Sequence, residues 1–260
     1  MKSEEAWRPL VGELPPLARG EVHLVRARIA HAGADEAHEA FFRGALTGAE
    51  KARADRLIDP RRAREWSAAR ASLRHILAAA VGGACDPLSL RFSAGPHKKP
   101  HLITDPSGAA HHLRFNLSHS GVWALVAITS QDELGVDVEY RDLDRPTPAL
   151  ARYAFSRDEY ARWEALCEEE QKLAFYRLWT RKEAYIKALG MGLHLDLKSF
   201  DLSHEEDATR LLEARHEGAP EAIAFESFMV DGRHQGALAI CRDALERISS
   251  WEWSPGSDDE

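Results

Sequence analysis

The sequence predicts an α+β fold built from two similar halves that meet near residue 130. Apolar or alternating runs at residues 123–128 and 134–140 are typical of strands, the first buried on both faces. Two long helical runs, residues 61–81 and 168–189, give each half one long helix that ends at glycine. The helices end in related sequences, RASLRHILAAAVG and RKEAYIKALGMG, which favours an internal duplication. We therefore expect two pseudo-equivalent α/β subdomains.

Shorter elements complete both halves. An alternating run predicts a strand at residues 22–29, and the pattern LSLRFS predicts another at 88–93. Further helices are expected at residues 36–42, 48–57, 147–154 and 157–166, and three or four strands between residues 200 and 240. We expect an N-terminal subdomain at residues 1–130, a C-terminal subdomain at 131–248 and a flexible tail at 249–260.

Composition restricts the partners. Lys and Arg total 34 against 42 Asp and Glu, a formal charge of −8, which disfavours a nucleic-acid partner. Three isolated cysteines form no metal or disulfide pattern, and no apolar run has membrane-spanning length, so we expect a cytoplasmic protein without a membrane partner. Residues 51–75 nevertheless hold eight basic against three acidic residues. This basic patch is either a solvated helix face or a site for a small anion.

The first motif with chemical potential is GVDVE at residues 135–139. Because side chains alternate along a strand, Asp137 and Glu139 project from one face, while Val136 and Val138 project from the other. Two neighbouring carboxylates suit Mg²⁺, which binds a few carboxylates together with water and phosphate oxygens. The alternative is an edge strand with a solvated acidic face.

The second motif is WTRKEAYIK at residues 179–187. Helical spacing predicts one stripe that combines apolar and charged side chains: Phe175, Trp179, Lys182, Glu183, Ile186 and Lys187. Charges within an apolar stripe are costly unless they are paired, so they indicate a ligand or a metal. An ordinary surface pair between Glu183 and Lys187 is the alternative.

The third motif is FNLSHSG at residues 115–121, which we interpret as a loop at the mouth of the buried strand. Its hydroxyl, amide and imidazole groups can bind phosphate oxygens, with Ser118 as a donor and His119 adding positive charge. A Ser–His nucleophile is disfavoured, because adjacent residues on an extended segment point apart and no nucleophile-elbow pattern is present.

The order of the three motifs resembles that of the Sfp-type 4′-phosphopantetheinyl transferase family. The family pattern is F-N-[LI]-S-H-S, then G-[VI]-D-[VI]-E, then W-x-x-K-E-[AS]-x-x-K with a closing G-x-G, and each element is present here. The resemblance covers roughly residues 46–195. GPHKKP at residues 95–100 stands where the family has H-G-K-P, so that Lys98 replaces the usual glycine.

The resemblance implies a fold of two similar halves with the active site in the cleft between them. It implies Mg²⁺, or Mn²⁺ as a substitute, bound by Asp137, Glu139 and Glu183. Glu183, Lys187 and His119 would be the catalytic residues. The implied coenzyme A contacts are Arg53, Arg56 and Arg70 at the 3′-phosphate, together with Lys99, Pro100, Ser118, His119, Lys182 and Lys187.

The implied reaction transfers the phosphopantetheine arm of coenzyme A to a serine of an apo acyl or peptidyl carrier protein and releases 3′,5′-ADP. Glu183 would be the general base, a metal ligand or both. We expect a monomer, because a chain with two halves closes its own cleft. The alternatives are a non-catalytic homologue that binds coenzyme A or a carrier protein, and a magnesium-dependent nucleotide phosphohydrolase.

Overall fold

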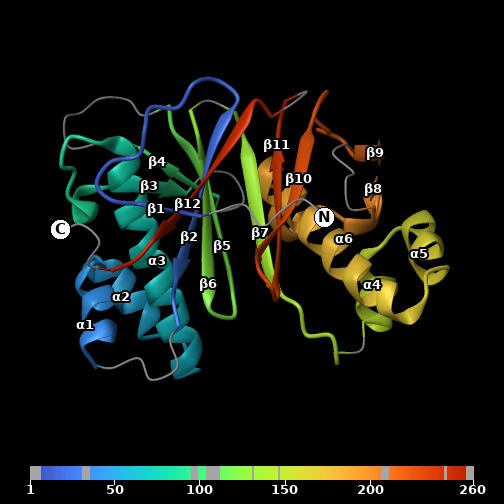
Figure 1. The fold of residues 1–260 in the computed structure, drawn as a ribbon, viewed down its shortest axis with the longest axis horizontal. Helices are drawn as coiled ribbons and strands as arrows, with labels where there is room; N and C mark the ends of the chain where they lie inside the picture. Colours follow the sequence, from blue (N-terminus) through green and yellow to red (C-terminus); the bar gives the residue numbers. More distant parts are fainter. Residues whose placement is uncertain are drawn as a thin grey trace.

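Two β-sheets pack face to face at the centre of the protein, and helices cover their outer faces (Figure 1). The computed structural model describes residues 7–30, 36–94, 99–103, 112–130, 132–145, 147–205, 211–242 and 245–255. Apolar side chains from both inner faces, among them Leu24 and Leu125 from one sheet and Val136 and Leu238 from the other, form a shared core. The expected α+β fold is confirmed.

The first half is a five-stranded sheet with three helices on its outer face. The strand order is β1 (Arg8–Pro9), β12 (Arg247–Trp253), β2 (Glu21–Arg28), β6 (Trp123–Thr129) and β5 (Arg114–Ser120). The helices are α1 (Glu36–Gly44), α2 (Gly48–Ala54) and α3 (Pro60–Val81), and a small hairpin is formed by β3 (Phe92–Ala94) and β4 (Pro100–Leu102). Helix α3 begins where the sequence predicts, because the Asp59 carboxylate caps the backbone N–H of Arg61 and Pro60 occupies the first turn.

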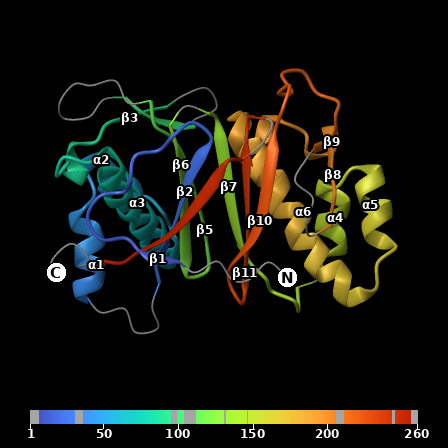
Figure 2. The same cartoon turned by 45° about the horizontal axis from the view of Figure 1, so that its top comes forward.

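The second half is a three-stranded sheet covered by α6 (Glu168–Leu189). The strand order is β10 (Ala224–Asp231), β11 (His234–Ile240) and β7 (Leu134–Tyr140). Helices α4 (Pro148–Ala154) and α5 (Arg157–Glu164) and the pair β8 (Phe200–Leu202) and β9 (Leu211–Ala214) lie on the far side of α6 (Figure 2). Helix α6 crosses β7 at Gly135, where an added Cβ would lie 2.1 Å from the Ala184 carbonyl oxygen. The glycine of GVDVE therefore permits close packing of helix and strand.

The halves share a plan but differ in size. Helices α3 and α6 each have 22 residues and each packs on its own sheet, but one sheet has five strands and the other three. Among the described residues, no helix is both long and apolar enough to cross a membrane.

Side chains of β5 join the two sheets at their neighbouring edges. The Asn116 Oδ1 atom accepts a hydrogen bond from the Val136 N–H at 3.0 Å. The Ser118 and Ser120 hydroxyls accept from the N–H groups of Val138 and Tyr140 at 3.4 and 3.1 Å. In the described residues β5 and β7 belong to different sheets, so these side chains satisfy donors that a backbone ladder would otherwise bind. The seam places the FNLSHSG motif directly beside GVDVE.

Three expectations from the sequence are wrong. The FNLSHSG segment is strand β5 rather than a loop, because its alternate polar residues bind the edge of β7. Residues 249–253 are not a flexible tail, because they belong to β12, which pairs in parallel with β2 and buries Trp253. Residues 256–260 lie outside the described residues. The LSLRFS segment is divided into a short 3-10 helix, Pro87–Ser89, and strand β3, since Asp86 caps the turn at Leu88.

Candidate active site

One hollow between the two halves collects the acidic side chains of two motifs. Strand β7 presents Asp137 and Glu139 toward α6, and α6 presents Glu183 and Lys187 one turn apart. The hollow has a volume of about 390 Å³ and is lined by Leu117, Ser118, His119, Asp137, Glu139, Trp179, Glu183 and Lys187. The structure therefore brings all three predicted metal-ligating carboxylates to one cavity.

Asp137 is buried, yet only one of its two carboxylate oxygens is bound. Oδ1 accepts hydrogen bonds from Ser118 Oγ at 2.9 Å and Lys187 Nζ at 2.7 Å. Oδ2 is a buried atom without a hydrogen-bond partner among the described residues. An unpaired buried carboxylate oxygen is costly. The free oxygen beside two further carboxylates fits a bound divalent cation.

Glu139 lies beside Asp137 and is held through both of its oxygens. Ser120 Oγ donates to Oε2 at 3.0 Å, and Trp179 Nε1 donates to Oε1 at 3.3 Å. Burial, and next the negative charge of Asp137, raise the pKa of Glu139 to about 7. A cation in the hollow would favour the charged carboxylate and offset both effects.

Glu183 faces the same hollow from α6 and has no side-chain hydrogen bond among the contacts described. Burial, followed by the charge of Asp137, raises the pKa of Glu183, while Lys187 opposes the shift. In the positions that the side chains adopt, no three His, Cys, Asp or Glu residues of the described segments are arranged to bind one metal ion. Shared coordination by Asp137, Glu139 and Glu183 would therefore require side-chain rotation into the hollow.

Two basic residues, Lys187 and His119, line the hollow. Lys187 Nζ donates to Ser118 Oγ, Asp137 Oδ1 and the Val136 carbonyl at 2.7–3.2 Å, and this places a cation at the centre of the site. Loss of hydration on burial lowers the pKa of His119, and Lys187 lowers it further, against the opposing charge of Glu65. The His119 side chain is exposed at the edge of the hollow, and its imidazole can donate a hydrogen bond there.

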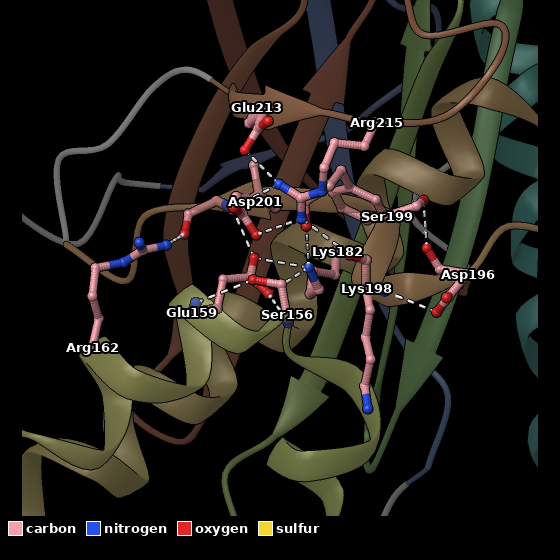
Figure 3. A network of polar contacts seen from close by, with 12 residues as sticks. Ser156, Glu159, Arg162, Lys182, Asp196, Lys198, Ser199, Asp201, Glu213 and Arg215 are labelled. Carbon is pink, nitrogen blue, oxygen red and sulfur yellow. Dashed lines mark hydrogen bonds and ion pairs between the residues drawn. The ribbon is translucent and has the colours of Figure 1, made fainter.

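Lys182 does not reach the hollow, so its predicted role as a coenzyme A ligand is wrong. Its side chain is 0% exposed and points into the core of the second half. Its Nζ atom lies 2.6 Å from Glu159 Oε2 and 2.9 Å from the Phe200 carbonyl oxygen (Figure 3). The predicted stripe is divided because neighbouring helix residues are about 100° apart, so Lys182 and Glu183 face different sides of α6.

Lys99 is also bound elsewhere. Its ammonium group donates to Glu133 Oε2 at 2.6 Å and to the Leu134 and Ala188 carbonyls at 3.0 Å each. All three donors of this ammonium group are used, as are those of Lys187, but Lys99 does not line the hollow. Pro100 pairs with Ala94 in the β3–β4 hairpin and does not line the hollow. The structure thus assigns Lys99 to joining the halves, and residue 98 lies outside the described residues.

The three predicted arginines lie on the first half, outside the hollow. Arg53 and Arg56 are exposed, and the Arg53 guanidinium stacks 5.2 Å from the centre of the Trp66 ring. Arg70 is bound to Glu50 and lies 4.1 Å from the centre of the Phe92 ring. Arg53 and Arg56 remain candidates for an anion on this face, whereas the Arg70 charge is already paired.

Two residues of the site were not predicted as site residues from the sequence. Ser120 and Trp179 both donate to Glu139. The alternation N-x-S-x-S at residues 116–120 was the available signal for Ser120, because it places all three polar side chains on one face of a strand. The Trp179 indole was assigned only to an apolar stripe, since spacing alone does not show its partner.

A larger hollow of about 700 Å³ lies between α1, α3 and the β5–β6 turn. Many of its lining residues are apolar, including Ile29, Phe42 and Val122, and it contains none of the three carboxylates at Asp137, Glu139 and Glu183. The larger volume would favour this hollow as the active site. The smaller hollow, however, contains the three carboxylates and Lys187, which are the groups that could bind a metal ion and phosphate.

Comparison with known proteins connects this site to a family. A sequence model of the 4′-phosphopantetheinyl transferase superfamily matches residues 133–241, which include β7 and α6. The 4′-phosphopantetheinyl transferase HetI of a Nostoc species is 34% identical over 190 residues, which cover 73% of this chain and 77% of HetI. A 4′-phosphopantetheinyl transferase of Bacillus subtilis is 35% identical over 164 residues, 63% of this chain and 68% of its own. The transferase Sfp of Bacillus subtilis is 34% identical over 157 residues, 60% of this chain and 64% of its own.

Proposed function

The chain belongs to the 4′-phosphopantetheinyl transferase superfamily, and we propose that its cleft transfers the phosphopantetheine arm of coenzyme A to a serine of an apo carrier protein. The observation that carries this proposal is the single hollow shared by Asp137, Glu139, Glu183 and Lys187. Two motifs of the family pattern supply these side chains, and the third motif supplies Ser118, which binds two of them.

The three carboxylates suit a divalent cation, and Mg²⁺ is the ion we propose, with Mn²⁺ as a substitute. Oδ2 of Asp137, which has no hydrogen-bond partner in the described segments, and the crowding of Asp137 and Glu139 support this assignment. The bound ion would neutralise negative charge on the pyrophosphate of coenzyme A. Asp137, Glu139 and Glu183 would hold it.

Lys187 binds the phosphate oxygens in our proposal. Its Nζ atom lies in the hollow, and its bond to Asp137 can be exchanged for a bond to a phosphate oxygen. His119 and Ser118 line the same hollow and can each add a hydrogen bond. Arg53 and Arg56 provide exposed positive charge for the 3′-phosphate on the neighbouring face.

Glu183 is the proposed proton acceptor. The serine hydroxyl of the carrier attacks the β-phosphorus of coenzyme A, a new P–O bond forms, and the bond to the departing 3′,5′-ADP breaks. The hydroxyl proton passes to Glu183, whose carboxylate faces the same hollow from α6. Its carboxylate is not committed to a hydrogen bond described in the structure, which supports this role.

Both sides of the cleft come from one chain, so we propose that the monomer is the active unit. We propose a cytoplasmic enzyme without a nucleic-acid or membrane partner, since the net charge is −8 and carrier proteins are its substrates.

Intact-mass analysis of an apo carrier protein tests the proposal directly. The carrier is incubated with coenzyme A, Mg²⁺ and the enzyme, using a panel of fatty-acid, polyketide and peptide carriers. We expect at least one carrier to gain one phosphopantetheine arm and 3′,5′-ADP to appear in equal amount. Nucleotide release without carrier modification would indicate a phosphohydrolase. Coenzyme A binding without any turnover across the panel would indicate a non-catalytic homologue.

A further inference from the structure

Glu139 accepts a hydrogen bond through each of its two carboxylate oxygens, and the two donors come from different halves. Ser120 on β5 donates to Oε2, and Trp179 on α6 donates to Oε1. A carboxylate bound through both oxygens cannot rotate without breaking a hydrogen bond. Its position is therefore determined jointly by the seam strand and by the helix that carries Glu183.

The position needs support because Glu139 stands next to Asp137. Like charges repel, and repulsion alone would turn the flexible Glu139 side chain away from Asp137 toward solvent. The Ser120 hydroxyl opposes that rotation from the β5 side. The Trp179 indole is itself supported, since its ring stacks on Phe175 with centroids 5.8 Å apart and planes 25° apart.

We propose that Ser120 and Trp179 are positioning residues that hold the Glu139 carboxylate in the hollow for divalent-cation binding. The inference rests on the proposed function, because it concerns the same metal site. Neither residue has to touch coenzyme A or the carrier for this role. Donors that orient a metal ligand typically change metal affinity by 10–100-fold when they are removed.

The seam provides a matched control. Ser120 has two tasks, because it accepts from the Tyr140 N–H and donates to Glu139. Asn116 only accepts a hydrogen bond from a β7 backbone N–H, that of Val136, and it has no bond to Glu139 among the contacts described. Substitution of Ser120 and of Asn116 therefore weakens the seam in similar ways, but only the Ser120 variant releases a carboxylate of the hollow.

The test measures Mn²⁺ binding by electron paramagnetic resonance in four variants without coenzyme A. We expect Ser120→Ala and Trp179→Phe to weaken Mn²⁺ binding by about 10-fold or more. Ser120→Thr, which keeps the hydroxyl, and Asn116→Ala should bind as the wild type does. Trp179→Phe keeps an aromatic ring for stacking on Phe175 and removes the N–H donor together with one ring of the indole, so it remains informative if Ser120→Ala does not fold.

Activity assays separate this inference from the proposed function. With wild-type transfer intact, we expect a higher Mg²⁺ concentration for half-maximal rate in Ser120→Ala and Trp179→Phe, and an unchanged KM for coenzyme A at saturating Mg²⁺. Wild-type Mn²⁺ affinity in either variant would remove that residue from the proposal. An equal loss of Mn²⁺ affinity in Asn116→Ala would contradict the proposal, because weakening the contact between β5 and β7 would then explain the loss. Absence of transfer by the wild type would instead contradict the proposed function.

Discussion

Lys182 and Glu183 are neighbours on α6, but their side chains enter two regions that differ in how completely their charged groups are paired. Lys182 enters a buried network in which Glu159 also accepts from the backbone N–H groups of Ser156 and Leu202 (Figure 3). Glu183 enters a hollow in which Asp137 Oδ2 has no partner among the described residues. Buried charges that are fully paired make the surrounding core rigid, whereas unpaired charges around a cavity indicate a ligand.

The largest effect is expected from the buried network. Lys182→Met should lower the free energy of unfolding by about 3–5 kcal/mol, because it leaves the Glu159 carboxylate buried without its cation. Urea denaturation measures the loss, and the transfer rate per folded molecule should stay near that of the wild type. A double variant with Glu159→Gln should recover part of the stability. A loss below about 1 kcal/mol would contradict the assignment of this pair to the structure.

Substitution of Glu183 should lower activity and leave stability nearly unchanged, which is the reverse of the result expected for Lys182. Glu183→Gln should lower kcat by about 10²–10³-fold, because it removes the proposed base and a carboxylate from the hollow. Its free energy of unfolding should be unchanged or slightly raised, since the substitution removes negative charge near Asp137. Steady-state kinetics and urea denaturation of the same preparation check both points. Full activity would show that the base is elsewhere.

Glu50 provides a pH test of a second buried charge network, in which it binds both Arg70 and Arg74. Burial raises its pKa, but hydrogen bonds from Arg74 and Arg70 overcome this effect and lower the pKa to about 2. The stabilisation is present above the ordinary value of 4.5 and is lost as the pH falls from there toward 2. We expect Glu50→Gln to remove at most about 3 kcal/mol at pH 7, with a smaller difference from the wild type at low pH.

The control for Glu50 is Asp55→Asn. Asp55 binds Arg43 at the surface, where both side chains are about half exposed, so its loss should cost well under 1 kcal/mol at any pH. Similar pH profiles for the two variants would show that the ion pairs of Glu50 with Arg70 and Arg74 contribute no more stability than a surface ion pair.

The smallest effect is expected at the exposed arginines. Arg53→Ala and Arg56→Ala should raise the KM for coenzyme A by a few fold, because an exposed charge contributes up to about 1 kcal/mol. Dephospho-coenzyme A lacks the 3′-phosphate and serves as the matched substrate, with little change expected. Equal changes for both substrates would remove these arginines from the 3′-phosphate site.

Local pattern predicted most of the fold. The cap at Asp59 and Pro60, the apolar run of β6 and the alternation of β7 all correspond to observed elements. Strand β12 was missed because its partner β2 lies more than 200 residues away, and the pairing Trp251 with Val25 has no local signal. Non-local pairing of this kind depends on the whole fold and not on a window of sequence.

The site was predictable where a motif specifies which face of an element a side chain occupies. Asp137 and Glu139 alternate on a strand, and their shared face follows from the period of two. Lys182 was misplaced because a helical stripe about 100° wide includes residues at its border, and only packing decides which side of α6 they enter. For Lys99, the motif identified the residue but not its bonds to Glu133 and two carbonyls.

The most direct test of the account is a Mn²⁺ titration of the wild type and of Asp137→Asn. If Asp137, Glu139 and Glu183 share one cation, the wild type should bind one Mn²⁺ per chain in this hollow, and Asp137→Asn should lose that site while keeping its fold. Undiminished binding of one Mn²⁺ by Asp137→Asn would contradict the account, because the ion would then be held by other residues.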